Sequence, residues 1–132
     1  MDIVIVTARP DFWLRFSAFL RERHITAHVV DHPDHIAGAL EDNPAGDFRL
    51  VIIDLPYDFD SMRDYAAQAL NLRDNLSVAA THSMPDYLFA QAAAGLRLFP
   101  LPRSPREADL EKLLGACDRP GMIRPTDPAA LQ

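Results

Sequence analysis

The sequence of 132 residues contains very little lysine or cysteine and no long hydrophobic run. Lys112 is the only lysine among thirteen basic residues, and Cys117 is the only cysteine. A single cysteine excludes an internal disulfide and a Cys-x-x-Cys redox or zinc site. No apolar stretch approaches the length that spans a bilayer, and the N-terminus has no basic segment followed by an apolar one. We therefore expect a cytoplasmic protein that does not bind membranes.

The composition is that of an ordinary globular protein, with 48% hydrophobic and 24% charged residues. Nineteen acidic residues against thirteen basic ones give a formal net charge of −6. This charge argues against nonspecific binding of nucleic acid, which requires a basic face toward the phosphates. The length fits one domain, because two domains would each have too little core.

Short β-rich runs alternate with stretches of helical periodicity along the chain. Strands are predicted at 2–7, 25–30, 50–54, 76–80 and 97–101. Helices are predicted at 12–23, 33–41, 61–72, 83–95 and 104–117, the last two from capping-box sequences that begin at Ser83 and Ser104. This alternation predicts an α/β fold, a parallel sheet with helices on both faces.

Two features predict the order of the strands. The runs at 2–7 and 50–54 are almost continuously apolar, which is typical of strands buried on both faces in the middle of a sheet. Pro100 cannot donate to a β-ladder, so the strand at 97–101 is expected at an edge. Both features fit a flavodoxin-like, doubly wound (βα)5 fold with strand order 2-1-3-4-5. We assign residues 1–117 to this domain and 118–132, which contain three prolines, to a flexible tail or linker.

In this topology ligands and chemistry collect at the carboxyl ends of the strands. Asp54 is the informative residue there, because it is a carboxylate that ends an apolar strand. One interpretation gives it a functional role at the mouth of the sheet. The other is that Asp54 only caps the following loop.

Residues 2–117 resemble the receiver domain of bacterial response regulators, element by element. The resemblance implies that Asp54 is the position of the phospho-acceptor and that Thr81 is the hydroxyl residue ending strand four. It also implies that Leu101-Pro102 stands where the family has a Lys-Pro pair, whose peptide bond is commonly cis. Thr7 and Ala8 correspond to the acidic pair that holds Mg²⁺ in the family.

The departures from the family pattern indicate a degenerate receiver, or pseudo-receiver. Phosphoryl transfer to a carboxylate builds negative charge that Mg²⁺ and a cation must neutralise. Thr7 and Ala8 supply no carboxylate for Mg²⁺, and Lys112 lies too far along the last helix to replace the missing lysine. Asp54 therefore remains without a metal site.

A buried carboxylate without a metal requires another partner. We expect Arg9, or as a second choice Arg103, to place a guanidinium against Asp54, because an arginine fork matches a carboxylate well. The alternative is that both arginines point into solvent, as most arginines do.

In the family, helix four, strand five and helix five form the signalling surface, and an aromatic residue that ends strand five acts as a switch. The corresponding surface is expected to include Phe99, Leu101, Pro102, Arg103, Leu110 and Leu114. The alternative is that the apolar members of this set belong to the core.

These observations predict an atypical receiver-like signalling module of a bacterial two-component system. It is expected to act through a protein partner or as a homodimer, without enzymatic activity, a cofactor or direct contact with nucleic acid. One alternative is a working phospho-acceptor that uses Asp54, Thr81 and Mg²⁺. Another is a flavodoxin-like small-ligand binder, although the turn after strand one has no glycine for a phosphate loop. The closely spaced histidines 24, 28, 32 and 35 are interpreted as surface residues rather than a metal site.

Overall fold

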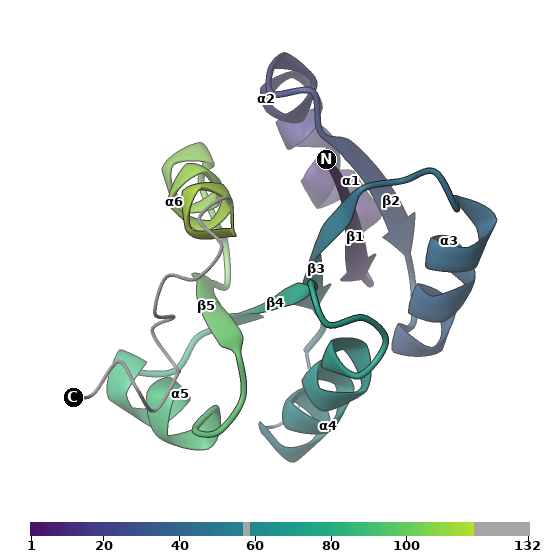
Figure 1. The fold of residues 1–132 in the computed structure, drawn as a ribbon. Coiled ribbons are helices and arrows are strands. Elements are labelled where there is room, and N and C mark those ends of the chain that lie inside the picture. Colours follow the sequence, from purple (N-terminus) through teal and green to yellow (C-terminus); the bar gives the residue numbers. More distant parts are fainter. Residues whose placement is uncertain (57–58, 118–132) are drawn as a thin grey trace.

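The computed structural model of the chain describes residues 1–56 and 59–117; the tail predicted at 118–132 lies outside the described residues. All strands of the described part form one parallel sheet in the order β2-β1-β3-β4-β5 (Figure 1). The strands are β1 (Asp2–Thr7), β2 (Thr26–Val30), β3 (Phe48–Asp54), β4 (Ser77–His82) and β5 (Leu98–Pro102). The flavodoxin-like order 2-1-3-4-5 predicted from the sequence is confirmed.

The helices of the described residues alternate with the strands, as predicted. They are α1 (Pro10–Trp13), α2 (Ser17–Glu22), α3 (Ile36–Asp42), α4 (Phe59–Leu70), α5 (Asp86–Ala92) and α6 (Glu107–Cys117). Single 3₁₀ turns, η1 (Leu14–Phe16) and η2 (Pro33–His35), precede α2 and α3, so the first predicted helix is divided into three pieces. Within 1–56 and 59–117, no helix combines the length and apolar character that crossing a bilayer requires.

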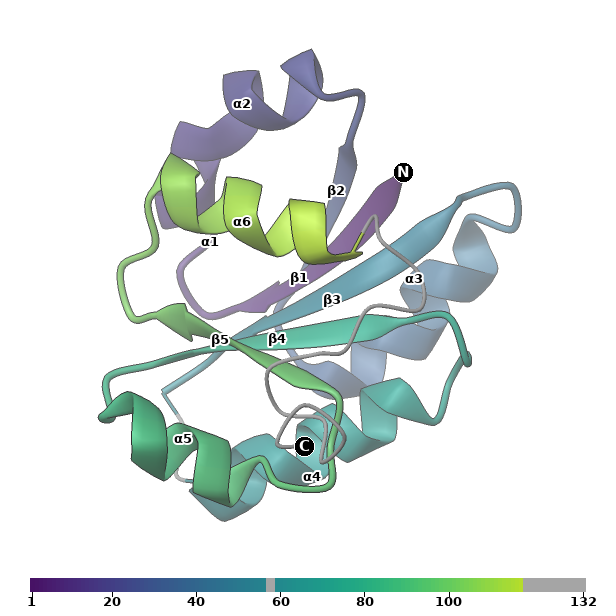
Figure 2. The ribbon, with the colours of Figure 1, turned by 60° about the vertical axis from the view of Figure 1, so that its left-hand side comes forward.

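The sheet separates two apolar layers, because successive side chains of a strand point to opposite faces. Val4 and Val6 of β1 face the layer that contains α3, α4 and α5, whereas Ile3 and Ile5 face the layer that contains α1, α2 and α6. Figure 2 shows these two groups of helices on opposite sides of the sheet. This alternation also determines which side chains meet at the ends of the strands.

The predicted positions of the central and edge strands are also confirmed. β1 and β3 each pair with a neighbour on both sides, and every residue of β3 except Arg49 is buried. β5 pairs with β4 alone, which leaves Pro100 in an edge strand where a missing N–H is tolerated.

Neither predicted capping box forms. α5 begins at Asp86 after Pro85, whose side chain offers no cap, and α6 begins at Glu107. Ser83 and Ser104 therefore lie three residues before the first helical residue. At α6 the Asp109 carboxylate accepts the N–H of Arg106 at 2.9 Å instead, which satisfies one of the free donors at the helix start.

Two glycines that have room for a Cβ provide a matched test of backbone strain. Gly95 has a φ of +85°, and a Cβ at Gly95 or at Gly115 in α6 would contact nothing within 4 Å. We expect Gly95→Ala to lower the free energy of unfolding by about 1 kcal/mol, because an alanine is strained at positive φ. Gly115→Ala should raise it by about 0.5–1 kcal/mol, because alanine is the better helix former. Urea denaturation of both variants checks these opposite signs; equal shifts would contradict the account.

Candidate functional site

The site is built around Asp54, which lies between two threonines at the carboxyl ends of adjacent strands. Thr7 of β1 is the register partner of Asp54 in β3, and Thr81 follows Ala80, the β4 partner of Ile53. Residue parity places all three side chains on the face of the sheet that α1 and α6 cover. Asp54 is only 1% exposed, and both threonines are buried with it. The carboxylate is therefore cut off from water.

Arg9 reaches Asp54 from the turn between β1 and α1. Its N–H donates to Thr7 Oγ1 at 3.0 Å, and its carbonyl accepts the N–H of Phe12 at 3.1 Å. Pro10 occupies the first helical position, where its missing N–H has no cost. The turn directs the guanidinium onto the carboxylate as a fork: Nε donates to Oδ2 and Nη2 to Oδ1, each at 2.8 Å.

Three neutral donors complete the environment of the carboxylate. Thr7 Oγ1 and Trp13 Nε1 donate to Oδ2 at 2.7 and 2.8 Å, and Thr81 Oγ1 donates to Oδ1 at 2.8 Å. With the two bonds from Arg9, Asp54 accepts five hydrogen bonds from the described residues. A carboxylate offers about four lone-pair sites. Both oxygens are therefore saturated by groups of the protein itself.

The hydrogen bonds between Arg9 and Asp54 shift the pKa of each group in the direction that keeps it charged. Burial raises the pKa of the Asp54 carboxyl, but the hydrogen bonds from Arg9, Trp13, Thr7 and Thr81 outweigh burial and lower it to about 2. The hydrogen bond to Asp54 raises the pKa of Arg9 in turn, although burial opposes it. At neutral pH the site therefore contains a fixed ion pair.

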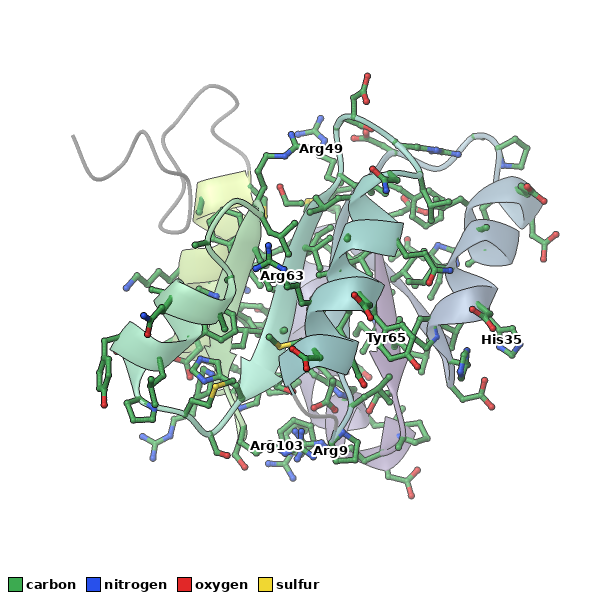
Figure 3. The ribbon with its side chains drawn as sticks, turned by 90° about the horizontal axis from the view of Figure 1, so that it is seen from below. Arg9, His35, Arg49, Arg63, Tyr65 and Arg103 are labelled. Atoms are coloured by element: carbon green, nitrogen blue, oxygen red, sulfur yellow. The ribbon has the colours of Figure 1, made fainter. Side chains whose placement is uncertain are left out.

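Arg103, the second expected counter-ion, lies beside Arg9 but does not form the fork. Its Nη1 is 3.9 Å from Asp54 Oδ1, and its backbone carbonyl accepts a hydrogen bond from Arg9 Nη2. Figure 3 shows the two arginines together at the carboxyl end of the sheet. Arg103 thus orients Arg9 through its backbone and adds a second positive charge to the mouth of the site.

The residues present do not fit the Mg²⁺ that receiver domains use. Mg²⁺ requires hard oxygen ligands with free lone pairs. Among the described residues, the side chains bonded to Asp54 are those of Thr7, Arg9, Trp13 and Thr81, and none of them brings a second carboxylate. Both oxygens of Asp54 already accept protein donors, and a divalent ion on either oxygen would lie against the Arg9 guanidinium. Ala8, at the other position of the family's acidic pair, has no donor atom to offer.

The apolar side chains expected on a signalling surface are part of the core. Phe99, Leu101, Leu110 and Leu114 are all buried in the layer beneath α6. The reason is the register of β4 with β5, which pairs Phe99 with Ala79 and Leu101 with Thr81 on the covered face. The prediction that these four residues form a surface is wrong.

Pro102 and Arg103 of the same predicted surface are at least partly exposed. The Leu101–Pro102 bond is trans, so the cis bond expected from the resemblance is also wrong. Leu101 offers no ammonium group whose placement would depend on that bond. The residue-level match to the family is therefore weakened at the end of β5.

The closely spaced histidines make separate local contacts. His28 pairs with Asp2 at 2.9 Å and His35 with Asp31 at 3.0 Å, while His32 accepts the N–H of Asp34. Among the described residues there is no group of three or more His, Cys, Asp or Glu side chains arranged to hold a metal ion.

Two donors to Asp54 were not predicted from the sequence. The sequence pattern offered no reason to assign a role to the indole N–H of Trp13, and Thr7 was interpreted only as a position where the family's metal ligand is missing. The alternation of side chains along β1 could have predicted the role of Thr7, because every second residue of a strand points to the same face. Ile3, Ile5 and Thr7 therefore share one face. Trp13 belongs to the layer on that same face.

Comparison with known proteins supports the fold. No family model matches the chain, and no curated protein matches it. The receiver domain of the hybrid histidine kinase CckA matches with a TM-score of 0.63 and 16% identity over 90% of this chain and 100% of that chain. A response regulator receiver protein from Burkholderia phymatum matches with a TM-score of 0.61 and 18% identity over 94% of this chain and 98% of that chain. The chain therefore has the fold of response-regulator receiver domains.

The fork between Arg9 and Asp54 predicts an unequal cost for two arginines that contact the same ring. The guanidinium carbons of Arg9 and Arg15 lie 4.1 and 4.3 Å from the centre of the Phe12 ring. Of these two arginines, Arg9 alone is bonded to Asp54. We expect Arg9→Ala to lower the free energy of unfolding by about 2–3 kcal/mol, because a buried carboxylate loses its cation. Arg15→Ala should cost less than about 1 kcal/mol. Equal costs in urea denaturation would contradict the pairing.

The low pKa of Asp54 predicts a specific loss of stability in acid. A carboxyl whose pKa is lower in the folded than in the unfolded state stabilises the fold above its unfolded pKa, and the effect disappears as the pH falls through the folded value. Relative to Asp54→Asn, the wild-type chain should lose about 1 kcal/mol between pH 5 and pH 3 and about 2 kcal/mol by pH 2. Chemical denaturation of both proteins across this range measures the difference. Parallel stability curves would show that the carboxylate is not stabilised by the fold.

Proposed function

We propose that this chain is an atypical, receiver-like signalling module of a two-component system that does not use Mg²⁺-dependent phosphorylation. In this proposal Arg9 permanently supplies the positive charge that a metal and a phosphoryl-binding lysine supply in a working receiver. The module then acts by binding a protein partner or a second copy of itself, without enzymatic activity of its own and without direct contact with nucleic acid.

The saturation of Asp54 is the observation that carries this proposal. A phospho-acceptor needs one carboxylate oxygen free to attack phosphorus, and the metal needs the other. Here Oδ2 accepts hydrogen bonds from Thr7, Arg9 and Trp13, and Oδ1 accepts them from Arg9 and Thr81. Attack would require breaking the fork and exposing a carboxylate that is 1% exposed.

The same contacts support a module that is held in one state. Arg9 and Trp13 connect the β1–α1 segment to β3, and Thr81 connects β4 to the same carboxylate. In a switch driven by phosphorylation the hydroxyl at the end of β4 must be free to move toward the phosphoryl group. Here the hydroxyl of Thr81 already donates to Asp54 at 2.8 Å.

The proposed partner surface is the face formed by α5, β5 and α6, the elements that correspond to helix four, strand five and helix five of the resemblance. Since its predicted apolar residues are buried, other side chains must make the contact. Tyr87 of α5 is 72% exposed, Leu88 beside it is also exposed, and Pro102 is exposed at the end of β5. An exposed aromatic ring with a polar tip is well suited to a protein interface.

Treatment with a small-molecule phosphoryl donor tests the proposal directly. In the presence of millimolar Mg²⁺ and acetyl phosphate, we expect no base-labile adduct on Asp54 by mass spectrometry. Mg²⁺ with beryllofluoride should also leave the fluorescence of Trp13 unchanged, because the indole stays bonded to the carboxylate. A working receiver domain treated in parallel shows that the reagents are active.

Asp54→Asn provides the matched control for both measurements. An adduct or a fluorescence change that appears in the wild-type chain and disappears in Asp54→Asn would overturn the proposal. That result would restore the alternative of a working phospho-acceptor that uses Asp54 and Thr81.

A further inference from the structure

The two edges of the sheet differ in what they offer to another strand. β5 carries Pro100 and Pro102, which are two residues apart, and so their missing N–H groups lie on the same side of the strand. A proline in an edge strand has its N side turned away from the sheet, so this edge is blocked. β2, Thr26–Val30, pairs only with β1 and contains neither a proline nor a formally charged residue. Charges and prolines are common means of protecting an edge, and β2 has none.

A groove runs along the outer side of β2 against α3 and η2. One part, against α3, has a volume of about 530 Å³, and a second part of about 450 Å³ lies toward the carboxyl end of β1. Val29, Val30 and His35 line both parts, so the hollow is continuous along the edge. Figure 1 shows α3 beside β2 at this side of the sheet.

Gly38 in α3 forms part of the groove wall and has no reason within the fold to be glycine. It lies inside a helix, where glycine is less stable than alanine, and a Cβ there would meet nothing within 4 Å. Its φ is not in the left-handed region. The absence of a side chain keeps the groove open for a chain that approaches from outside.

Val29 leaves an apolar side chain uncovered at this edge, on the face of the sheet opposite to α3. Its register partner Ile5 belongs to the layer of α1 and α2, so the Val29 side chain points to that face. Val29 is 48% exposed, because no strand lies beyond β2. A sixth strand would cover it.

The charge of the groove selects the kind of strand that fits. Asp31, Asp34 and Asp42 line it, and no lysine or arginine of the described part of the chain does. The two histidines in its wall are already paired, His28 with Asp2 and His35 with Asp31. A second copy of this chain that paired β2 with β2 would bring two such acidic walls together, which costs free energy.

We propose that the β2 edge binds an extended segment of a partner protein in which basic and apolar residues alternate. The segment adds a sixth strand by main-chain hydrogen bonds. Its basic side chains lie over α3 beside Asp34 and Asp42, and its apolar side chains pack on Val29. This surface lies at the opposite edge of the sheet from the α5–β5–α6 face, and it does not depend on the state of Asp54.

Binding of a blocked eight-residue peptide of alternating lysine and valine tests this inference with the full chain. We expect fluorescence anisotropy to show saturable binding and hydrogen exchange to show slower exchange of β2 amides. A peptide with four lysines followed by four valines has the same charge and composition and should bind about tenfold more weakly.

Gly38→Gln should abolish binding of the alternating peptide by filling the groove, while thermal unfolding shows that the fold is retained. Asp34→Asn with Asp42→Asn should weaken binding about fivefold, because two rim ion pairs are lost. Glu22→Gln with Asp74→Asn removes the same charge outside the groove and should change binding by less than about twofold.

Three results would overturn the inference. The first is equal binding of the alternating and block peptides, which would mean that only net charge is recognised. The second is unchanged binding by a folded Gly38→Gln chain. The third is self-association that protects the β2 amides without any peptide, which would make a second copy the occupant.

Discussion

An aspartate carboxylate held away from water at the end of a central strand must be neutralised by the protein around it. In this chain the Arg9 guanidinium does so with two hydrogen bonds of 2.8 Å, and Trp13 and two threonines supply the remaining donors. The arrangement dictates the conformation of the β1–α1 turn. The chain must leave β1 after Thr7 and turn so that the Arg9 side chain reaches back to Asp54 of β3. It also joins β1, β3, β4 and α1 at a single point.

This solution differs in kind from a metal site at the same place. A bound Mg²⁺ can exchange its waters for phosphoryl oxygens, so a metal-neutralised carboxylate stays available for chemistry. A guanidinium fork has its donors in a fixed plane and uses them up on the carboxylate. The proposed loss of phosphoryl transfer thus follows from the replacement of an exchangeable cation by a covalently attached one.

The receiver fold has other surfaces that do not depend on the Asp54 site. The face of α5, β5 and α6 exposes an aromatic side chain, whereas the β2 edge exposes main-chain groups next to an acidic groove. The first suits a partner that packs side chains on a helix, and the second suits an extended strand. The two proposed contacts lie at opposite edges of the sheet, so neither would block the other.

Local patterns were enough to predict the elements, their order and the position of Asp54. Continuous apolar runs identify the central strands, Pro100 identifies an edge, and parallel topology brings the strand ends together. They were also enough to nominate Arg9, since it lies in the turn that follows a strand flanking Asp54. Which side chains surround Asp54, and whether Phe99 and Leu101 are surface or core, depended on the register between strands and on the helix that covers each face. Register is set by the packing of the whole sheet, because a shift of one residue turns every side chain of a strand to the opposite face.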